Sequence, residues 1–240
     1  MATYQTTAIV IGRTNLGEAD RIVRLLTPRH GKLSAVAKGV RKIKSRAGGH
    51  LELFGEVGLM LAEGRGSLDI ITSARLAWYP HTLADNYVGL GLAYAFAGLI
   101  DRLAQERQAQ PELYDHLAEA LRAVNDGAAG SLVELWYKLR LLQLTGYRPE
   151  LTACLSCGRR DATEYRFDAA RGGIVCDACA DAIARPISLS TIKLWRLLSD
   201  YPYATVAHIT DGPTLATASL ALCDEFYEHH IGKAFRPGIG

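Results

Sequence analysis

Residues 154–180 read CLSCGRRDATEYRFDAARGGIVCDACA and contain two Cys-x-x-Cys pairs separated by eighteen residues. Two residues between the thiols of each pair allow a tight turn that aims both sulfurs at one point, and two such turns complete a tetrahedral site of four thiolates. Zinc prefers this ligand set. Because four protein thiolates leave no position open for water, the spacing predicts one structural rather than catalytic Zn²⁺. Its predicted ligands are Cys154, Cys157, Cys176 and Cys179.

Two other uses of paired cysteines fit the sequence less well. Two disulfide bonds would require an oxidising compartment, and the opening residues MATYQTTAIVIGR lack the basic start, apolar core and small-residue cleavage site of a secretory signal. A redox-active Cys-x-x-Cys pair normally occurs singly on a thioredoxin-like βαβ unit, and the sequence pattern does not predict such a unit. We therefore expect a zinc site in a cytoplasmic protein. The fifth cysteine, Cys223 in SLALCDEFYEHH, has helical spacing and is expected to be an ordinary buried thiol.

Composition indicates a folded protein without a membrane span. The chain has 240 residues, of which 49% are hydrophobic, enough for one or two domains with cores of their own. The most membrane-like run, residues 86–100, has fifteen uncharged residues. A membrane helix needs roughly 18. The run therefore predicts a buried helix, and no membrane partner is expected.

Charge is distributed unevenly along the chain. The formal net charge of +2 combines +6 in residues 1–80 with −4 in the remainder. Four thiolates with one Zn²⁺ would make the second part more negative still. This asymmetry predicts that the N-terminal part meets a polyanion.

The first eighty residues contain five segments rich in β-branched and apolar residues, joined by glycine-containing turns. Little helical periodicity interrupts them, which favours a small closed five-stranded barrel of the OB-fold type, while an SH3-like barrel fits nearly as well. The expected strands are residues 4–12, 21–27, 32–40, 50–63 and 67–79.

From Pro80 onward the hydrophobic period changes from two to between three and four, which predicts helices and a domain boundary. After a first helix that ends before Pro111, the expected helices are residues 111–124, 131–147, 188–201 and 213–233. Ser131, with Glu134 three residues later, predicts a capping box. The predicted fold class is α+β, with an OB-fold domain at residues 1–80, a helical domain at residues 81–240, and a zinc module at residues 152–182 inserted in the latter.

One segment of the predicted barrel is strongly basic. No acidic residue lies between Asp20 and Glu52, whereas nine Lys or Arg residues do. The core of this segment, KGVRKIKSRAGG, alternates cations with small residues, so several side chains can follow successive phosphates of a nucleic acid. The alternative is a solvated, mobile loop without a ligand. The candidate nucleic-acid-binding residues are Arg24, Arg29, Lys32, Lys38, Arg41, Lys42, Lys44 and Arg46.

Aromatic residues that could stack on bases are scarce in this domain. Tyr4, Phe54, Trp78 and Tyr79 are its only aromatics, and each fits a core or domain-interface position as well. Electrostatic binding with weak sequence preference is therefore expected. A solubilising role is favoured over a second nucleic-acid contact for the arginines of the zinc loop, which are Arg159, Arg160, Arg166 and Arg171.

No catalytic constellation is recognisable, and we expect no enzyme activity. The sequence has no G-x-x-x-x-G-K-[ST] phosphate loop, no G-x-S-x-G elbow and no H-E-x-x-H motif. Zinc-containing NAD-dependent deacylases also use paired Cys-x-x-Cys motifs, but the dinucleotide fingerprint is missing, since the glycines near Gly89 lie in a predicted helix. Four ionisable residues lie near the end of the last predicted helix, where the helix dipole favours protonated histidine. They are Glu225, Glu228, His229 and His230.

Three stretches carry a resemblance. Residues 19–46, ADRIVRLLTPRHGKLSAVAKGVRKIKSR, contain a strand, a Thr-x-x-x-Gly-Lys turn and an Ala-Lys-Gly-Val-Arg stretch. Residues 141–158, LLQLTGYRPELTACLSCG, and residues 172–180, GGIVCDACA, lead into the two cysteine pairs. In this order, over most of the chain, they resemble the RecO family, the bacterial recombination-mediator and DNA-annealing proteins. The first long helix departs from the family, because AYAFAGLIDRL lacks the Glu-Leu that members often carry.

The resemblance implies an N-terminal OB-fold, a helical body and an embedded four-cysteine zinc module. It also implies binding of single- and double-stranded DNA and annealing of complementary strands. The implied partners are RecR, the single-stranded-DNA-binding protein SSB and, indirectly, RecA, in the cytoplasm at the bacterial nucleoid. The residues themselves support only the binding of a polyanion. The alternative is a zinc-stabilised helical scaffold that binds proteins and has no direct DNA role.

Overall fold

The computed structural model describes residues 2–42, 48–64, 66–128 and 130–232. They form two compact units, one ending at Gly127 and one beginning at Ala128. The chain changes from strands to helices near residue 80, but the first two long helices belong to the same compact unit as the strands. Among the described helices, none is long and apolar enough to cross a membrane.

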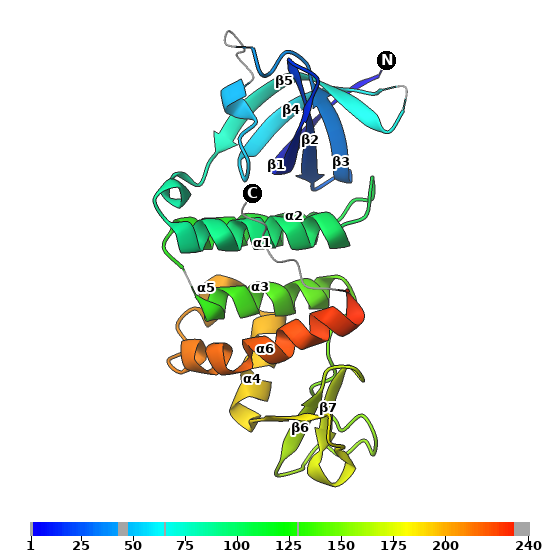
Figure 1. The fold of residues 1–240 in the computed structure, drawn as a ribbon, viewed down its shortest axis with the longest axis vertical. Helices are drawn as coiled ribbons and strands as arrows, with labels where there is room; N and C mark the ends of the chain where they lie inside the picture. Colours follow the sequence, from blue (N-terminus) through cyan, green and yellow to red (C-terminus); the bar gives the residue numbers. More distant parts are fainter. Residues whose placement is uncertain (1, 43–47, 65, 129, 233–240) are drawn as a thin grey trace. The chain divides into compact units, whose positions relative to one another are not determined.

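The first unit contains a closed five-stranded barrel in the order β1-β2-β3-β5-β4, drawn at the top of Figure 1. Its strands are β1 (Thr3–Leu16), β2 (Asp20–Thr27), β3 (Gly31–Ala37), β4 (Glu56–Ala62) and β5 (Leu68–Trp78). Neighbouring strands are antiparallel except β3 and β5, which pair in parallel over residues 34–36 and 68–70. This arrangement confirms the predicted OB-fold barrel.

Alternating side chains explain why these segments form strands around one core. In β3, the side chains of Leu33, Ala35 and Ala37 are buried, and the residues between them are partly exposed. A bulge between Val10 and Gly12 shifts the register of β1. The first half of β1 therefore pairs with β4 and the second half with β2, which closes the barrel.

Two long helices complete the first unit. They are α1 (Tyr87–Leu103) and α2 (Pro111–Asn125), with the short 3₁₀ helices η1 (Gly48–His50) and η2 (His81–Ala84). Glu56 at the start of β4 accepts a hydrogen bond from Tyr114 of α2 at 2.9 Å and forms an ion pair with Arg122 of the same helix. Phe54 packs edge to face on Tyr94 of α1, with ring centroids 5.0 Å apart. These contacts hold both helices to the barrel, below it in Figure 1.

The segment that follows α1 returns to the barrel and pairs with the start of β3. The Lys32 N–H donates to Gln105 O at 3.3 Å, and the Arg107 N–H donates to Lys32 O at 2.9 Å. Gly31 has a φ of +61°, and a Cβ at this position would overlap the carbonyl oxygen of Gln108. Glycine is therefore required here for its backbone conformation and for space.

A buried carboxylate fastens the same segment. Asp69 of β5 is 1% exposed and accepts hydrogen bonds from the Tyr4 hydroxyl at 2.5 Å and from Arg107 at 3.0 Å. Two donors from distant parts of the chain thus satisfy one buried acceptor. This network joins β1, β5 and the segment between α1 and α2.

In its described residues, the second unit combines four α-helices with a small sheet. The helices are α3 (Ser131–Leu144), α4 (Leu189–Asp200), α5 (Tyr203–Val206) and α6 (Gly212–His230). The sheet has the order β7-β6-β8 and consists of β6 (Tyr165–Asp168), β7 (Gly173–Cys176) and β8 (Arg185–Ile187). It lies between α3 and α4 in the chain. Strands β6 and β7 fall within the predicted zinc module of residues 152–182, whereas β8 follows it, and the sequence patterns did not predict any of the three short strands.

Aromatic packing fixes this sheet on the helices. Phe167 of β6 packs on Trp195 of α4 and on Phe226 of α6, with ring centroids 5.1 and 6.1 Å apart. The indole N–H of Trp195 donates to Ser219 Oγ of α6 at 3.0 Å. The sheet and the two helices therefore share one core.

The predicted capping box at the start of α3 is wrong. Gly130 is the N-cap and makes no side-chain hydrogen bond. The Ser131 hydroxyl instead lies 3.3 Å from Pro213 O and 2.5 Å from Thr217 Oγ1. Glu134 pairs with a lysine one turn later in the helix. Both side chains therefore bond to other partners and leave the backbone N–H groups of the helix N-terminus uncapped by them.

Candidate metal centre and nucleic-acid interface

Four cysteines of the second unit meet in one cluster. The Sγ atoms of Cys154, Cys157, Cys176 and Cys179 all lie within 4.8 Å of one another, and those of Cys157 and Cys176 are 3.7 Å apart. Metal–sulfur bonds of about 2.3 Å in a tetrahedron would place the sulfurs roughly 3.8 Å apart. The structure thus brings the predicted ligands together in a cluster that could hold a metal ion.

Tight turns and backbone hydrogen bonds position these thiols. The Gly158 N–H donates to Cys154 O at 2.9 Å, and Gly158 has a φ of +73° that closes the first turn. Cys176 ends β7, and the last cysteine ends η3 (Asp177–Cys179). The Leu155 N–H donates to Ile174 O at 2.9 Å, which joins the two halves of the module. The two cysteine pairs are therefore held facing each other.

The clustered thiols affect one another's ionisation. Burial opposes ionisation of Cys154, but backbone N–H groups, among them those of Cys157 and Cys176, outweigh it and lower the pKa of Cys154 to about 6. Hydrogen bonds with Cys176 and Cys157, together with burial, raise the pKa of Cys179 to about 12. Neighbouring thiolates repel one another, so a bound cation is needed for all four to ionise together.

The fifth thiol is buried, and two arginines of the zinc module form hydrogen bonds within the protein. Cys223 of α6 is buried, and burial raises its pKa to about 12, as expected of an unreactive core thiol. Arg166 donates to Ala184 O at 3.0 Å, just after the predicted module, and Arg171 donates to Ser156 Oγ within it at 2.7 Å. Arg159 and Arg160 are exposed. Two of the four arginines therefore stabilise the module itself.

Two of the predicted nucleic-acid-binding residues form ion pairs with α1 and the segment after it. Arg24 Nε of β2 lies 3.2 Å from a carboxylate oxygen of Asp101. Lys32 Nζ of β3 lies 3.7 Å from Asp101 and 3.6 Å from Glu106, and its side chain is 14% exposed. Both charges are therefore engaged within the first unit.

Three other predicted residues, Lys38, Arg41 and Lys42, are exposed after the end of β3. We call residues 38–42 the basic turn. The Lys42 N–H donates to a backbone oxygen within the turn at 3.1 Å, so the three cations share one local structure. The predicted residues Lys44 and Arg46 lie outside the described residues.

The basic turn is fixed to the loop between β1 and β2. The Gly39 N–H donates to the Asp20 carboxylate at 2.7 Å, and the Arg41 N–H donates to Ala19 O at 3.0 Å. The Arg41 guanidinium also donates to Gly17 O at 2.8 Å. These bonds order the backbone that carries the cations.

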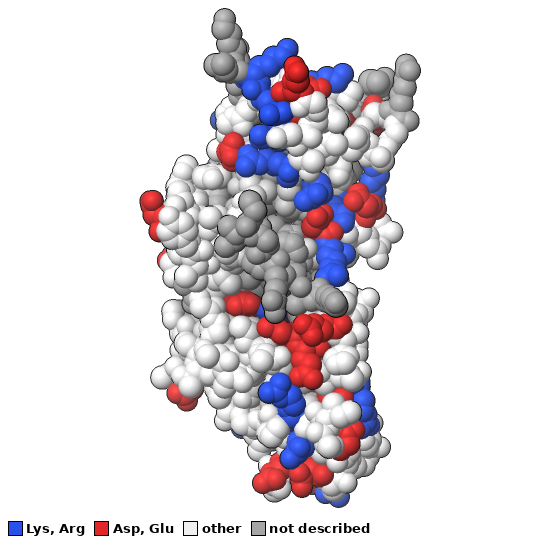
Figure 2. Space-filling view, viewed as in Figure 1, with Lys and Arg blue, Asp and Glu red and all other residues white. Residues whose placement is uncertain are grey.

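Arg29 lies at the other end of β2 and β3. It is exposed in the turn between these strands, whereas the basic turn follows the opposite end of β3. Since β2 has eight residues, its ends are roughly 23 Å apart at about 3.3 Å per residue. The exposed members of the predicted set thus form two separate basic regions. Figure 2 shows Lys and Arg side chains gathered over the barrel, at the top of the face in view.

None of the aromatic residues considered for base stacking lies in the basic turn. Phe54 is buried, and Tyr4 is bonded to a carboxylate. Trp78 and Tyr79 contact a neighbouring guanidinium and imidazole. The cations of the turn therefore act without an aromatic platform among these four residues.

Arg75 is a basic residue of the barrel that the sequence patterns did not single out. It is exposed on β5, where its neighbours Ala74 and Leu76 pack against the core. The period-two alternation of this strand could have placed its side chain on the outer face. One charged residue in a predicted strand does not indicate how that strand pairs. The sequence therefore could not predict which residues lie beside Arg75 on the neighbouring strands.

Two family models match the chain. The model described as "Recombination protein O N terminal" matches residues 1–79, and the model described as "Recombination protein O C terminal" matches residues 84–237. Together they span both compact units.

Curated relatives show the same similarity. A protein of Roseiflexus sp. (strain RS-1) named DNA repair protein RecO is 39% identical over 234 residues, which are 96% of this chain and 82% of that protein. A protein of the same name from Bifidobacterium longum subsp. infantis is 38% identical over 239 residues, covering 98% of this chain and 97% of the relative. One from Dehalococcoides mccartyi (strain CBDB1) is 30% identical over 208 residues, covering 86% and 82%.

Proposed function

We propose that this chain, which belongs to the RecO family of DNA repair proteins, acts as a recombination mediator whose basic turn holds the phosphate backbone of DNA. Its role in DNA repair follows from the family. In the finer proposal, it binds single- and double-stranded DNA and anneals complementary strands. With RecR as partner, it helps RecA to load onto single strands coated by SSB.

The exposed and hydrogen-bonded basic turn supports this proposal. Lys38, Arg41 and Lys42 present three cations on a backbone that is already ordered, so binding costs little further conformational entropy. Contacts to phosphate do not read the bases. A strand held in this way keeps its bases free to pair with a complementary strand, as annealing requires.

We assign the four-cysteine cluster to one Zn²⁺ with a structural role. Four thiolates suit zinc, and the separation of 3.7 Å between two of the sulfurs fits its tetrahedral geometry. The ion would join the two cysteine pairs and balance part of their charge. Since protein ligands fill the site, it offers no position for a substrate, and the proposed DNA contact lies elsewhere.

A salt titration of DNA binding tests the role of the basic turn. Lys38→Ala and Lys42→Ala are combined, while Arg41 is retained because it also holds the turn in place. Each phosphate contact contributes about 0.7 to the slope of log affinity against log salt for a single strand. The double variant should therefore bind fluorescent single-stranded DNA more weakly at low salt, with a slope smaller by roughly 1.4.

The exposed pair Arg159→Ala and Arg160→Ala is the matched control, because it also removes two cations. It should leave affinity and slope unchanged. Wild-type affinity and slope in the Lys38→Ala/Lys42→Ala variant, with unchanged thermal unfolding, would exclude the basic turn as the site. Absence of DNA binding by the wild type at low salt would favour the protein-binding scaffold. Annealing of complementary strands with and without SSB measures the mediator step.

A further inference from the structure

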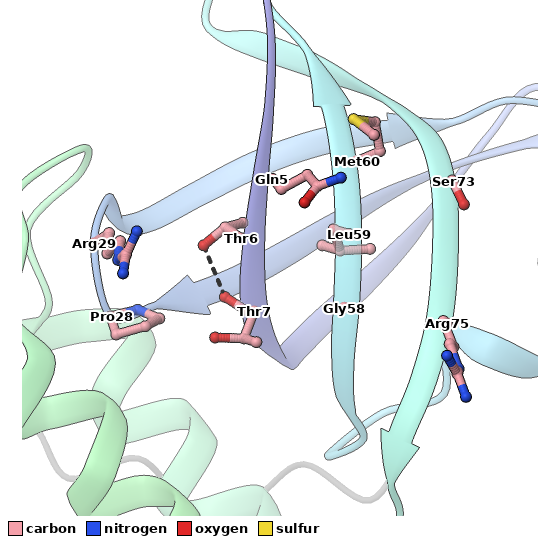
Figure 3. Close-up of a pocket in the computed structure, with 10 residues that line it drawn as sticks. All are labelled: Gln5, Thr6, Thr7, Pro28, Arg29, Gly58, Leu59, Met60, Ser73 and Arg75. Atoms are coloured by element: carbon pink, nitrogen blue, oxygen red, sulfur yellow. Dashed lines mark hydrogen bonds between the residues drawn. The ribbon is translucent and has the colours of Figure 1, made fainter.

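An open pocket of about 700 Å³ lies on the outer side of β1, β4 and β5, beside the turn between β2 and β3 (Figure 3). We call this surface the β1–β4–β5 face. The strand register aligns its residues in two rows across the three strands. One row is Gln5, Met60 and Ser73, and the other is Thr7, Gly58 and Arg75.

Gly58 creates the hollow in this face. Its neighbours Val57 and Leu59 are buried in the barrel core, so position 58 points outward. Because glycine has no side chain, the floor of the pocket is the backbone of β4. Figure 3 shows Thr7 on β1 and Arg75 on β5, on either side of Gly58. An extended ligand can therefore lie across the strands.

The pocket is cationic. Arg29 and Arg75 stand at opposite sides of it in Figure 3, both are exposed, and the other lining residues are uncharged. The carboxylate of Glu56, which precedes Gly58 on the outer side of β4, is already bound by Tyr114 and Arg122. Among the described lining residues, none therefore carries a negative charge that would repel an anion.

These features suit a chain of phosphates. The guanidinium groups of Arg29 and Arg75 can each bind phosphate through two parallel N–H···O bonds. The hydroxyl and amide groups of Thr7, Ser73 and Gln5 supply neutral donors on the same face. At a strand spacing of about 4.8 Å, β1 and β5 are roughly 10 Å apart. Arg29 lies in the turn between β2 and β3, on the other side of β1 from Arg75 in Figure 3, so the two arginines can contact different phosphates of one extended strand.

We propose that the β1–β4–β5 face is a second site for a DNA backbone, which holds one strand while the basic turn holds another. This inference rests on the function proposed for the basic turn. Arg29 and the basic turn lie at opposite ends of β2, roughly 23 Å apart. None of the described lining residues is aromatic, so the face binds the backbone and not the bases. One molecule thereby presents the bases of two strands for pairing.

The number of short oligonucleotides bound by the full chain tests this proposal. The probe is a fluorescent oligonucleotide of about four nucleotides, at the lower limit of OB-fold sites. At low salt the wild type should bind two per chain. Arg29→Ala/Arg75→Ala and Lys38→Ala/Lys42→Ala should each bind one. The rate of annealing two long complementary strands should fall about tenfold in the Arg29→Ala/Arg75→Ala variant, because two phosphate contacts are lost.

Two controls separate charge from folding. Arg29→Lys/Arg75→Lys keeps both cations and should retain the second oligonucleotide. All four side chains changed in the two alanine variants are exposed. Their thermal unfolding should therefore match that of the wild type.

Three outcomes would overturn the second site. In the first, Arg29→Ala/Arg75→Ala still binds two oligonucleotides per chain and anneals at the wild-type rate, while Lys38→Ala/Lys42→Ala binds only one. This outcome excludes the second site but keeps the basic turn as a DNA-binding site. The second is loss of all binding when the basic turn alone is changed. In the third, Arg29→Ala/Arg75→Ala loses binding of a polyglutamate peptide but keeps its binding of DNA. This outcome would assign the face to an acidic protein. If instead Lys38→Ala/Lys42→Ala changes nothing, the function proposed for the basic turn fails.

Discussion

Gly31 allows the segment between α1 and α2 to lie against the barrel. Its φ of +61° is a left-handed conformation that glycine adopts without strain, and Gln108 O leaves no room for a Cβ. Gly17 has a similar φ of +58°, but no atom lies within 4 Å of the place where its Cβ would be. A substitution at Gly17 would therefore cause backbone strain alone, whereas one at Gly31 would cause backbone strain and steric overlap.

Gly31→Ala should destabilise the protein more than Gly17→Ala. Both variants place a Cβ on left-handed backbone, at a cost of about 1–2 kcal/mol. Only Gly31→Ala also meets a backbone oxygen, which cannot rotate away, so its free energy of unfolding should fall by about 3 kcal/mol or more. Urea-induced unfolding measures both values. Equal losses would contradict the role assigned to Gln108.

Asp69 is the second residue that fastens this segment. Burial opposes its ionisation, but hydrogen bonds from Tyr4 and Arg107 outweigh it and hold its pKa below the ordinary value of 3.8. A carboxyl group whose pKa is lowered by folding stabilises the folded state above its unfolded pKa. That contribution is lost as the pH falls through the lower, folded pKa.

Asp69→Asn should therefore be less stable than the wild type at pH 7, and the difference should shrink as the pH falls below 3.8. Thermal unfolding of both proteins between pH 7 and pH 3 measures the difference. Asp161→Asn, at an exposed position, is the control and should match the wild type at pH 7. A difference that stays constant down to pH 3 would mean that the charge of Asp69 contributes nothing.

Among the described elements, the shortest strands are those of the sheet at the zinc module. They have three or four residues, which is the lower end of the usual range. Phe167 joins the sheet to α4 and α6, and the four cysteines join its two halves. A metal ion that binds only the folded arrangement adds its binding free energy to the stability of this unit.

Removal of the metal should consequently destabilise the second unit before it affects DNA binding by the basic turn. A chelator, or Cys176→Ser, should lower the unfolding temperature by about 10 °C or more. Metal analysis of the untreated protein should find one zinc per chain. Cys223→Ala is the control, because it removes a thiol outside the cluster and should keep the metal. Full thermal stability in metal-free protein would refute a structural role.

Over the whole molecule, periodicity predicted the classes of structure, while partners distant in sequence escaped prediction. Alternation indicated the five barrel strands, and cysteine spacing indicated a cluster that the structure brings together. Arg24 and Lys32 were grouped with the other cations because their partner Asp101 lies far away in the sequence. Ser131 fitted a capping motif, but α6 supplies its actual partners. Local patterns contain no information about such contacts.

The two compact units also bear on where the chain can be divided. The predicted boundary near residue 80 follows the change from strands to helices, whereas the first compact unit continues to Gly127. A fragment of residues 1–80 would lack α1 and α2, and with them the partners of Glu56, Lys32 and Asp69.

A fragment of residues 1–127 should therefore unfold cooperatively and be more stable than a fragment of residues 1–80. Because several buried or partly buried groups lose partners in the shorter fragment, its free energy of unfolding should be lower by about 3 kcal/mol or more. Urea-induced unfolding followed by circular dichroism compares the two. Equal stability would favour independent folding of the barrel and the boundary near residue 80.

The short parallel pairing of β3 with β5 has a consequence for self-association. The two strands pair over only three residues of each. The start of β3 would otherwise present free N–H and C=O groups, which are a template for pairing with a strand of another molecule. The backbone of Gln105 and Arg107 occupies those groups at Lys32. The chain thus covers its own exposed edge, and this protects the barrel against edge-to-edge aggregation.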